Sequence, residues 1–140
     1  MITWNNLDTL TSFKELENVE RVDLVKAMAG ENGAERVKNY SVPMAEGLTY
    51  NYAAKQVDDK VLAALAKLAD EAQLTEKFEA LYNGEVINTG EKRLVLHHMT
   101  RGQLGEAVEA DGVDKRTFYT EQQAKIADFA NKVHAGEITN

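Results

Sequence analysis

The stretch Gly84–Arg101 reads Gly-Glu-Val-Ile-Asn-Thr-Gly-Glu-Lys-Arg-Leu-Val-Leu-His-His-Met-Thr-Arg and is the least generic part of the chain. Its first part, Gly84 to Gly90, begins and ends with glycine and is predicted to be a turn-rich loop. Its second part, Arg93 to Met99, contains the apolar run Leu-Val-Leu. That run predicts either a buried strand or an irregular segment that faces inward.

Two helices are predicted before this loop. Asp58-Asp59 opens the first, Lys60 to Ala72, because acidic side chains suit the positive end of the helix dipole. The apolar stripe of this helix consists of Val61, Leu65, Leu68 and Ala72. Leu74-Thr75 then breaks the pattern, and Thr75 is expected to cap a second helix, Glu76 to Asn83, that ends at Gly84. We expect the two helices to form a helical hairpin.

The N-terminal third combines short helices with one β-hairpin. Residues 7–29 predict one helix or two short ones, and Gly30 is suited to end the last of them. Residues 31–33 are expected to form a turn and residues 34–38 a further helical turn. From Tyr40 the period changes to two. Residues 40–44 and 48–52 therefore predict the strands of a hairpin, with Pro43 confining the first strand to an edge.

A second loop and a final helix are predicted after Arg101. Gly102–Lys115 has glycines among acidic residues and is expected to be irregular. Thr120-Glu121-Gln122-Gln123 is a capping box that predicts the start of a helix, and Gly136 predicts its end. The apolar face of this helix consists of Ile126, Phe129, Ala130 and Val133. The predicted fold class is mainly α with a small β-hairpin (α+β), in a single domain spanning residues 1–140.

The composition argues against several classes of function. The net charge is −7 and no run of Lys or Arg exceeds two residues, so neither nucleic acid nor an anionic membrane is an expected partner. The absence of cysteine excludes disulfides, cysteine-ligated zinc and thiol catalysis. No apolar run is long enough to cross a bilayer, and the N-terminus lacks the features of a secretion signal. A cytoplasmic protein is therefore expected.

Adjacent histidines, His97 and His98, are the first candidates for chemistry. Neighbouring residues of an extended segment point to opposite sides, so these two cannot easily chelate one metal ion. The third histidine, His134, is distant in the sequence. We therefore expect no metal site. We expect His97 to pack in the core with its ring nitrogens hydrogen-bonded, and His98 to be exposed.

Three acidic pairs could in principle supply a general acid and a general base: Asp58 and Asp59, Asp70 and Glu71, and Glu106 and Glu109. A catalytic pair needs a raised pKa and hence burial, which nothing in the sequence around these pairs indicates. We expect them to cap helices or face solvent. Gly102-Gln103-Leu104-Gly105 is too short for a phosphate-binding P-loop and lacks the following Lys-Ser/Thr.

Arg93 and Arg101 are the best anion-binding candidates, because a guanidinium binds phosphate through two parallel hydrogen bonds. We favour a different role, in which both arginines fix the loop through ion pairs or backbone carbonyls. Residues 1–140 thus contain no predicted catalytic, cofactor-binding or metal-binding residue.

The stretch Gly84–Arg101 resembles a segment of the glucose-6-phosphate isomerase family. In that family a helix ends in a Gly-Glu-x-Ile-Asn turn, followed by Thr-Glu-x-Arg, then Leu-His and a closing Leu-Arg. His97 matches the Leu-His position and Arg101 the closing arginine. Gly90 and Gly102-Gln103 depart from the residues usual in the family.

Three further segments are similar to the same family. Residues 48–55 are similar to a strand ending in Asp-Tyr-Ser-Lys-Asn, although only Tyr52 matches outright. Leu68–Leu74 follows the family's Leu-Ala-x-Glu-Ala-x-Leu pattern, and Phe129–Glu137 follows its Phe-x-x-x-Val-x-x-Gly-Glu pattern. The segments occur in the family's order and at sensible spacing, which is more specific than any one of them alone.

The resemblance implies the N-terminal helical region of a sugar-isomerase-type α/β protein. Such isomerases interconvert glucose 6-phosphate and fructose 6-phosphate in glycolysis and gluconeogenesis. They use a glutamate that shuttles a proton through an enediol and a histidine that assists ring opening, and they need no cofactor. None of those residues maps onto positions 1–140, and the family's phosphate-binding Gly-Ile-Gly-Gly-Ser turn is expected beyond Asn140.

The chain alone is therefore expected to be inactive. The sugar phosphate is expected to bind the missing catalytic domains, and the full-length protein to be a homodimer. Whether His97 or Arg101 supports the active site from a distance stays open. The alternative hypothesis is a free-standing module that binds a protein partner through a helical face. A reading frame that continues into Gly-Ile-Gly-Gly-Ser would exclude that alternative.

Overall fold

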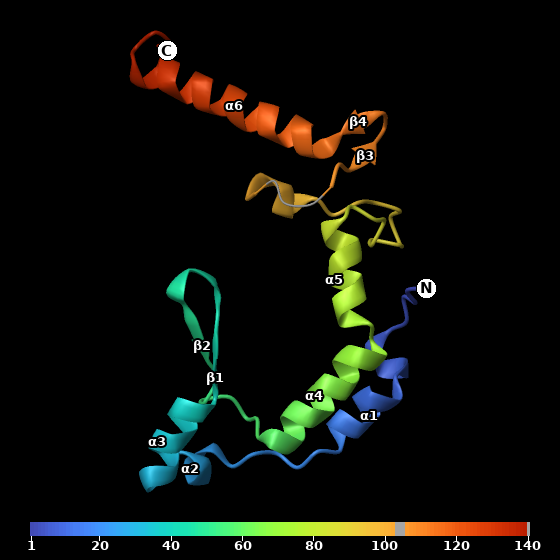
Figure 1. The fold of residues 1–140 in the computed structure, drawn as a ribbon, viewed down its shortest axis with the longest axis vertical. Coiled ribbons are helices and arrows are strands. Elements are labelled where there is room, and N and C mark those ends of the chain that lie inside the picture. The colour runs from blue at the N-terminus through green and yellow to red at the C-terminus, as the bar shows by residue number, and fades with distance from the viewer. Residues whose placement is uncertain (103–105, 140) are drawn as a thin grey trace. The chain divides into compact units, whose positions relative to one another are not determined.

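The structure is a computed structural model that describes residues 1–102 and 106–139. Helices dominate it, and the described strands form two separate antiparallel hairpins, β1–β2 and β3–β4 (Figure 1). The predicted fold class, mainly α with a small hairpin, is confirmed. The chain divides into two compact units. We refer to residues 5–73 as the N-terminal unit and to residues 1–4 with 74–140 as the C-terminal unit.

The N-terminal unit begins with short helices. A 3-10 turn, η1 (Leu7–Thr9), precedes α1 (Thr11–Glu17) and α2 (Leu24–Ala27). Of the two predicted alternatives for residues 7–29, the pair of short helices is confirmed. Asp23 starts α2, because its carboxylate accepts hydrogen bonds from the backbone N–H groups two and three residues later.

The next helix, α3 (Gly30–Asn39), corrects the prediction for residues 30–38. Gly30, with a φ of +58°, begins this helix rather than ending the one before it, and the predicted turn at residues 31–33 is helical. The reason is a close approach of two backbones. A Cβ on Gly33 would lie 2.4 Å from the carbonyl oxygen of Met28, so only glycine lets α3 start beside the end of α2.

The predicted hairpin is confirmed as β1 (Ser41–Pro43) and β2 (Thr49–Asn51), joined by the 3-10 turn η2 (Ala45–Gly47). Val42 pairs with Tyr50 at its centre. Because this sheet has two strands, both are edge strands, and Pro43 lies in an edge as predicted.

The predicted long helix is α4 (Asp59–Glu71), capped by Asp58, which accepts a hydrogen bond from the Val61 N–H at 2.9 Å. The other end of α4 caps α1. Leu10 stands at the N-cap position of α1 and has no side-chain oxygen with which to cap it. The Glu71 carboxylate accepts from the backbone N–H groups of Thr11 (3.2 Å) and Ser12 (2.7 Å) and from the Ser12 hydroxyl. A carboxylate from α4 thus replaces the missing cap of α1.

We expect Glu71→Gln to destabilise the N-terminal unit at neutral pH and to do so less in acid. The hydrogen bonds from Ser12 hold the pKa of Glu71 below its usual value of 4.5. Because the pKa is lower in the folded state, the stabilisation is present above the unfolded-state pKa and is lost as the pH falls through the folded-state value. Urea unfolding of both proteins from neutral to acidic pH measures this, with the exposed neighbour Asp70→Asn as the control. A stability gap that does not narrow in acid would show that the charge of this cap contributes nothing.

The second segment of the C-terminal unit, residues 74–140, begins with α5 (Leu74–Tyr82). The prediction that Thr75 caps this helix was wrong, because Thr75 lies inside it. The break between the helices falls at Gln73, whose φ is +54°. Glutamine rarely adopts such a left-handed conformation, so the sequence carries no sign of this break. The expected helical hairpin spans the boundary of the two units and stays a prediction.

Gly84 ends α5 as predicted. Its φ is +74°, its N–H bonds the Leu81 carbonyl, and the Glu85 N–H bonds the Ala80 carbonyl. These two bonds form a Schellman motif, which satisfies the last carbonyls of the helix.

The stretch after Gly84 forms the predicted turn-rich loop, closed by paired backbone hydrogen bonds between Asn88 and Arg93. Of the two alternatives for residues 93–99, the irregular inward-facing segment is confirmed. It leads into the 3-10 helix η3 (His97–Thr100) and buries Met99 completely. The core of this unit consists of Leu96, Met99 and Val108, with Leu94 and Tyr119 packed against it.

The stretch Gly102–Lys115, predicted to be irregular, contains a small hairpin, β3 (Glu109–Ala110) and β4 (Val113–Asp114). Residues 103–105 lie outside the described residues. The turn residues Asp111 and Gly112 have φ values of +54° and +72°, as a type I′ turn requires. Asp-Gly is a strong short-range signal for a hairpin. The hairpin was nevertheless not predicted, because the glycines of this stretch lie among acidic residues and the whole stretch was assigned to a loop.

The last helix, α6 (Lys115–His134), starts at Lys115 rather than at the predicted capping box. Asp114 caps it by accepting from the N–H groups of Arg116 (3.1 Å) and Thr117 (3.3 Å). Thr120 lies inside the helix, where its hydroxyl donates to the Arg116 carbonyl at 3.1 Å. The capping box was therefore a wrong prediction, because the carboxylate of Asp114 caps the helix first.

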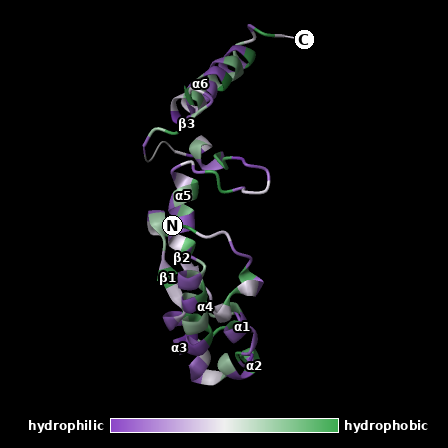
Figure 2. Ribbon diagram, turned by 90° about the vertical axis from the view of Figure 1, so that its right-hand side faces the viewer, coloured by the Kyte–Doolittle hydropathy of each residue, from purple (hydrophilic) through white to green (hydrophobic). Residues whose placement is uncertain are grey.

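Three of the four residues of the apolar face predicted for α6 are exposed, and Ala130 is half-buried. Ile126, Phe129 and Val133 are 68%, 58% and 43% exposed. Figure 2 shows hydrophobic and hydrophilic residues following one another along this helix. Gly136, with a φ of +74°, lies just past its end, as predicted. Within residues 1–102 and 106–139, no helix has both the length and the apolar character that crossing a membrane requires.

Candidate functional site

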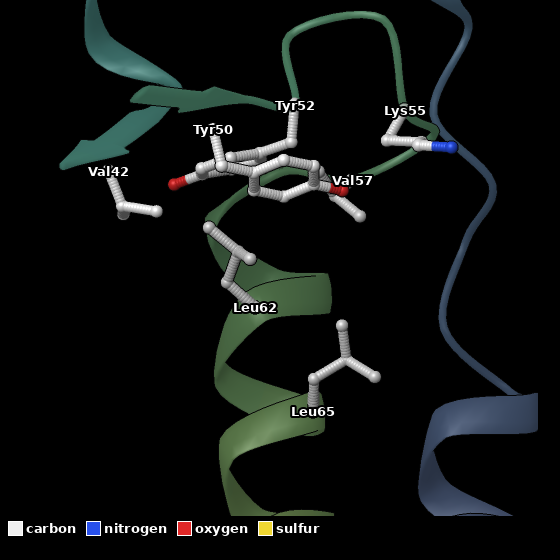
Figure 3. A pocket seen from close by; sticks show the side chains of 7 residues that line it. All are labelled: Val42, Tyr50, Tyr52, Lys55, Val57, Leu62 and Leu65. Atoms are coloured by element: carbon white, nitrogen blue, oxygen red, sulfur yellow. The ribbon is translucent and has the colours of Figure 1, made fainter. Parts of the chain in front are cut away.

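An apolar pocket of about 360 Å³ lies in the N-terminal unit between the β1–β2 hairpin and the start of α4 (Figure 3). The hairpin, the loop after it and α4 each contribute walls. The lining residues are Val42, Tyr50, Tyr52, Lys55, Val57, Leu62 and Leu65. Lys55 is the only charged residue among them. The pocket therefore offers mainly carbon surface.

Tyrosine rings form the hairpin wall of this pocket. The ring centroids of Tyr50 and Tyr52 lie 6.0 Å apart, and Tyr52 meets Tyr40 edge-on at 5.4 Å. The Tyr40 hydroxyl donates to the Asp59 carboxylate at 3.1 Å. Burial, and then this hydrogen bond, raise the pKa of Tyr40 above its usual value of 10.0. The hydroxyl therefore stays protonated at neutral pH and serves as a structural donor.

Arg36 of α3 holds the loop at the side of the pocket. Its guanidinium donates to the carbonyl oxygens of Ala53 (2.8 Å), Lys55 (3.0 Å) and Val57 (2.6 Å). It also lies 4.2 Å from the centroid of the Tyr40 ring. Arg36 is only 8% exposed, and buried carbonyls without a partner would be costly. The role of Arg36 was not predicted from the sequence, because an arginine in a polar helix carries no sign of partners in a distant loop.

Arg116 of α6 has a similar role in the C-terminal unit, which was also not predicted. It is 6% exposed, its Nε donates to the Glu106 carbonyl, and its Nη2 donates to the Tyr82 carbonyl at 2.9 Å. Its Nη1 has no hydrogen-bond partner in the described part of the chain. Arg116 thus ties the end of α5 to the segment before β3.

The predicted anion-binding candidates, Arg93 and Arg101, are both exposed. Arg93 pairs with Glu91 at 3.6 Å, as the loop-fixing role requires, although such an exposed ion pair contributes little. The side chain of Arg101 makes no ion pair or hydrogen bond with the residues that the structure describes. Neither arginine lies in the apolar pocket.

The structure reverses the predicted environments of the two histidines. His98 is half-buried, stacks on the Tyr82 ring with centroids 4.8 Å apart, and places Nε2 3.2 Å from the Tyr82 carbonyl oxygen. His97 is exposed. The cause is η3, whose tight helical turn replaces the alternation assumed for an extended segment. Among the described residues, no group of three or more His, Asp or Glu side chains is placed to hold a metal ion.

The acidic pairs cap helices or lie at the surface. Asp58 caps α4, Asp59 accepts from Tyr40, Glu71 caps α1, and Asp70, Glu106 and Glu109 are exposed. The lowered pKa of Glu71 is the opposite of what a general acid at neutral pH needs. Of the predicted glycine loop, Gln103, Leu104 and Gly105 lie outside the described residues.

Comparison with known proteins identifies the family. Residues 51–140 match the family model described as phosphoglucose isomerase, which is more than half of the chain. The chain belongs to the phosphoglucose isomerase family. The matched region contains Gly84–Arg101, Leu68–Leu74 and Phe129–Glu137, three of the segments that carry the resemblance. The family predicted from the sequence is therefore confirmed.

Individual relatives agree with this assignment. The chain is 51% identical to glucose-6-phosphate isomerase of Treponema denticola, over 96% of the chain and 27% of that protein. It is 40% identical to the protein of the same name from Treponema pallidum (strain Nichols), over 98% of the chain and 26% of that protein. It is 41% identical to glucose-6-phosphate isomerase of Borrelia garinii subsp. bavariensis, over 99% of the chain and 26% of that protein. The chain thus spans about a quarter of the length of these phosphoglucose isomerase relatives, and the alternative of a free-standing module finds no support.

Proposed function

We propose that the chain is the N-terminal part of a glucose-6-phosphate isomerase, the enzyme that interconverts glucose 6-phosphate and fructose 6-phosphate in glycolysis and gluconeogenesis. The observation that carries this proposal is the 51% identity to a glucose-6-phosphate isomerase over 96% of the chain. The whole enzyme acts in the cytoplasm as a homodimer and uses general acid–base catalysis without a cofactor.

We place the chemistry outside residues 1–140, which form one N-terminal region, with the catalytic sugar-isomerase domains in the rest of the polypeptide. Two features of the described residues support this. The pocket beside the hairpin has an apolar lining, whereas a sugar phosphate needs several placed donors and acceptors. The buried arginines, Arg36 and Arg116, both donate to backbone carbonyls, which indicates a structural role.

A coupled assay tests this proposal. The chain, verified by intact mass at 15.6 kDa, is mixed with fructose 6-phosphate and a dehydrogenase that consumes glucose 6-phosphate. We expect no turnover from the chain and full turnover from the longer product of the same gene. Turnover by the 15.6 kDa species would place the chemistry within these residues. An inactive longer product would refute the isomerase function.

A further inference from the structure

The β1–β2 hairpin has one apolar side. Alternate residues of a strand point to opposite sides of the sheet. The ladder extends beyond the paired strands, because the Met44 N–H donates to the Leu48 carbonyl at 2.8 Å and the Tyr52 N–H to the Tyr40 carbonyl at 2.9 Å. With Val42 opposite Tyr50, one side carries Tyr40, Val42, Met44, Leu48, Tyr50 and Tyr52. We name these residues the apolar hairpin face.

The other side of the hairpin is polar and already has a partner. It carries Ser41, Pro43, Thr49 and Asn51. The Ser41 hydroxyl donates to the Lys38 carbonyl at 3.1 Å, and the Asn51 amide donates to the Val37 carbonyl at 2.7 Å. The hairpin is thus bonded to α3 through its polar side. On the apolar hairpin face, Tyr40 at the base already contacts Arg36 and Asp59, and the residues nearer the tip are left for another contact.

Exposure of the apolar hairpin face increases towards its tip. Tyr40 and Tyr52, at the base, are half-buried. The exposed fractions beyond them are 43% for Val42, 48% for Tyr50, 57% for Met44 and 64% for Leu48. A two-stranded hairpin is only marginally stable by itself, and continuous exposed apolar surface marks an interaction site. We therefore expect the apolar hairpin face to be buried against another surface in the folded enzyme.

The apolar hairpin face and α4 line the same pocket. In Figure 3 the tyrosine rings and Val42 lie opposite Leu62 and Leu65 of α4, so that the hairpin and the helix are two walls of one pocket. The amino group of Lys55 points away from the rings. The surface offered is therefore carbon, which fits apolar side chains of a protein and not a charged metabolite.

We propose that the apolar hairpin face is the docking surface for the remaining part of the same isomerase polypeptide, whose apolar side chains fill the pocket. The inference rests on the proposed function, because it takes the chain to be part of a longer isomerase. The chain corresponds to 27% of the Treponema denticola relative, which leaves most of the polypeptide as a tethered partner. Tethering raises the effective concentration of that partner to about the millimolar range, so docking within one polypeptide precedes docking of a second copy.

Oxidation of Met44 by hydroxyl radicals tests the proposal in the unmodified full-length enzyme. The rate is compared with that of the same protein unfolded in urea. A docked face predicts protection of about tenfold or more at Met44, independent of enzyme concentration. A side chain that keeps its 57% exposure would be protected less than about twofold, which would overturn the proposal. If dilution dissociates the dimer and the protection of Met44 is lost at the same concentrations, the apolar hairpin face contacts a second copy of the enzyme. That result would also overturn the proposal.

A matched pair of variants gives a second readout. Leu48→Asp places a charge on the apolar hairpin face, and Thr49→Asp places the same charge on the polar side. We expect Leu48→Asp to lower the Tm of the full-length enzyme by about 4 °C while the dimer persists, and Thr49→Asp to change it by about 1 °C or less. Equal shifts for the two variants, or a Leu48→Asp protein that is a folded monomer, would contradict docking within one polypeptide.

The two proposals fail in different ways. Turnover by the wild-type full-length protein is measured separately, and its absence refutes the isomerase function alone. The protection of Met44 reports docking of the hairpin whether or not the protein turns over sugar phosphate.

Discussion

Arg36→Met is expected to destabilise the N-terminal unit by about 3 kcal/mol, because each hydrogen bond from a charged group contributes about 1.5–3 kcal/mol and the bonds of one group are not additive. Methionine keeps much of the buried stem and removes the guanidinium. The carbonyls of Ala53, Lys55 and Val57 then lose a donor at 2.6–3.0 Å. Urea unfolding measures the loss, and faster hydrogen exchange of the Lys55 and Val57 amides locates it in the loop beside the pocket.

Two further variants identify the cause of the loss. Lys38→Met, at an exposed position of the same helix, is expected to change the stability by less than about 0.5 kcal/mol. Arg36→Lys keeps the charge but is expected to lose most of the stability, because one ammonium cannot reproduce the fork of a guanidinium. An Arg36→Met protein that unfolds at the same urea concentration as Lys38→Met would mean that water satisfies these carbonyls.

The elements that the sequence predicted correctly have local causes. The apolar stripe of α4, the cap at Asp58 and the helix end at Gly84 depend on residues within a few positions of each other. The β1–β2 hairpin likewise follows from a change of period around a short turn. Such features are determined by short stretches, and for this reason a single sequence is enough to find them.

The errors have causes that are distant in sequence or hidden in backbone conformation. Gly33 is a packing residue because Met28 lies against it, and Gln73 adopts a left-handed conformation that its side chain does not favour. The cap of α1 comes from Glu71 on another helix. The buried arginines have backbone partners, and backbone carbonyls leave no trace in the sequence. The family could be predicted, because ordered motifs suffice for it, whereas the contacts that shape the pocket could not.

Gly84→Ala is expected to destabilise the C-terminal unit by about 3 kcal/mol, the sum of two separate costs. The φ of Gly84 is +74°, and the left-handed conformation costs an alanine about 1–2 kcal/mol. The new Cβ would also lie 2.3 Å from Cγ1 of Val108, a core residue that is 4% exposed. Forcing a methyl group into a packed core costs a further 1–3 kcal/mol or so. Urea unfolding monitored by circular dichroism measures the total.

Gly136→Ala separates the two costs, because Gly136 has the same φ of +74° but no atom within 4 Å of the position of a Cβ. This control is expected to lose only the conformational cost, about 1 kcal/mol. Combining Gly84→Ala with Val108→Ala should cost less than the sum of the two single changes, because the smaller side chain removes the clash. Equal losses for Gly84→Ala and Gly136→Ala would mean that Val108 moves aside freely. The contact between the end of α5 and the core would then be loose, and the glycine would be required by the backbone conformation alone.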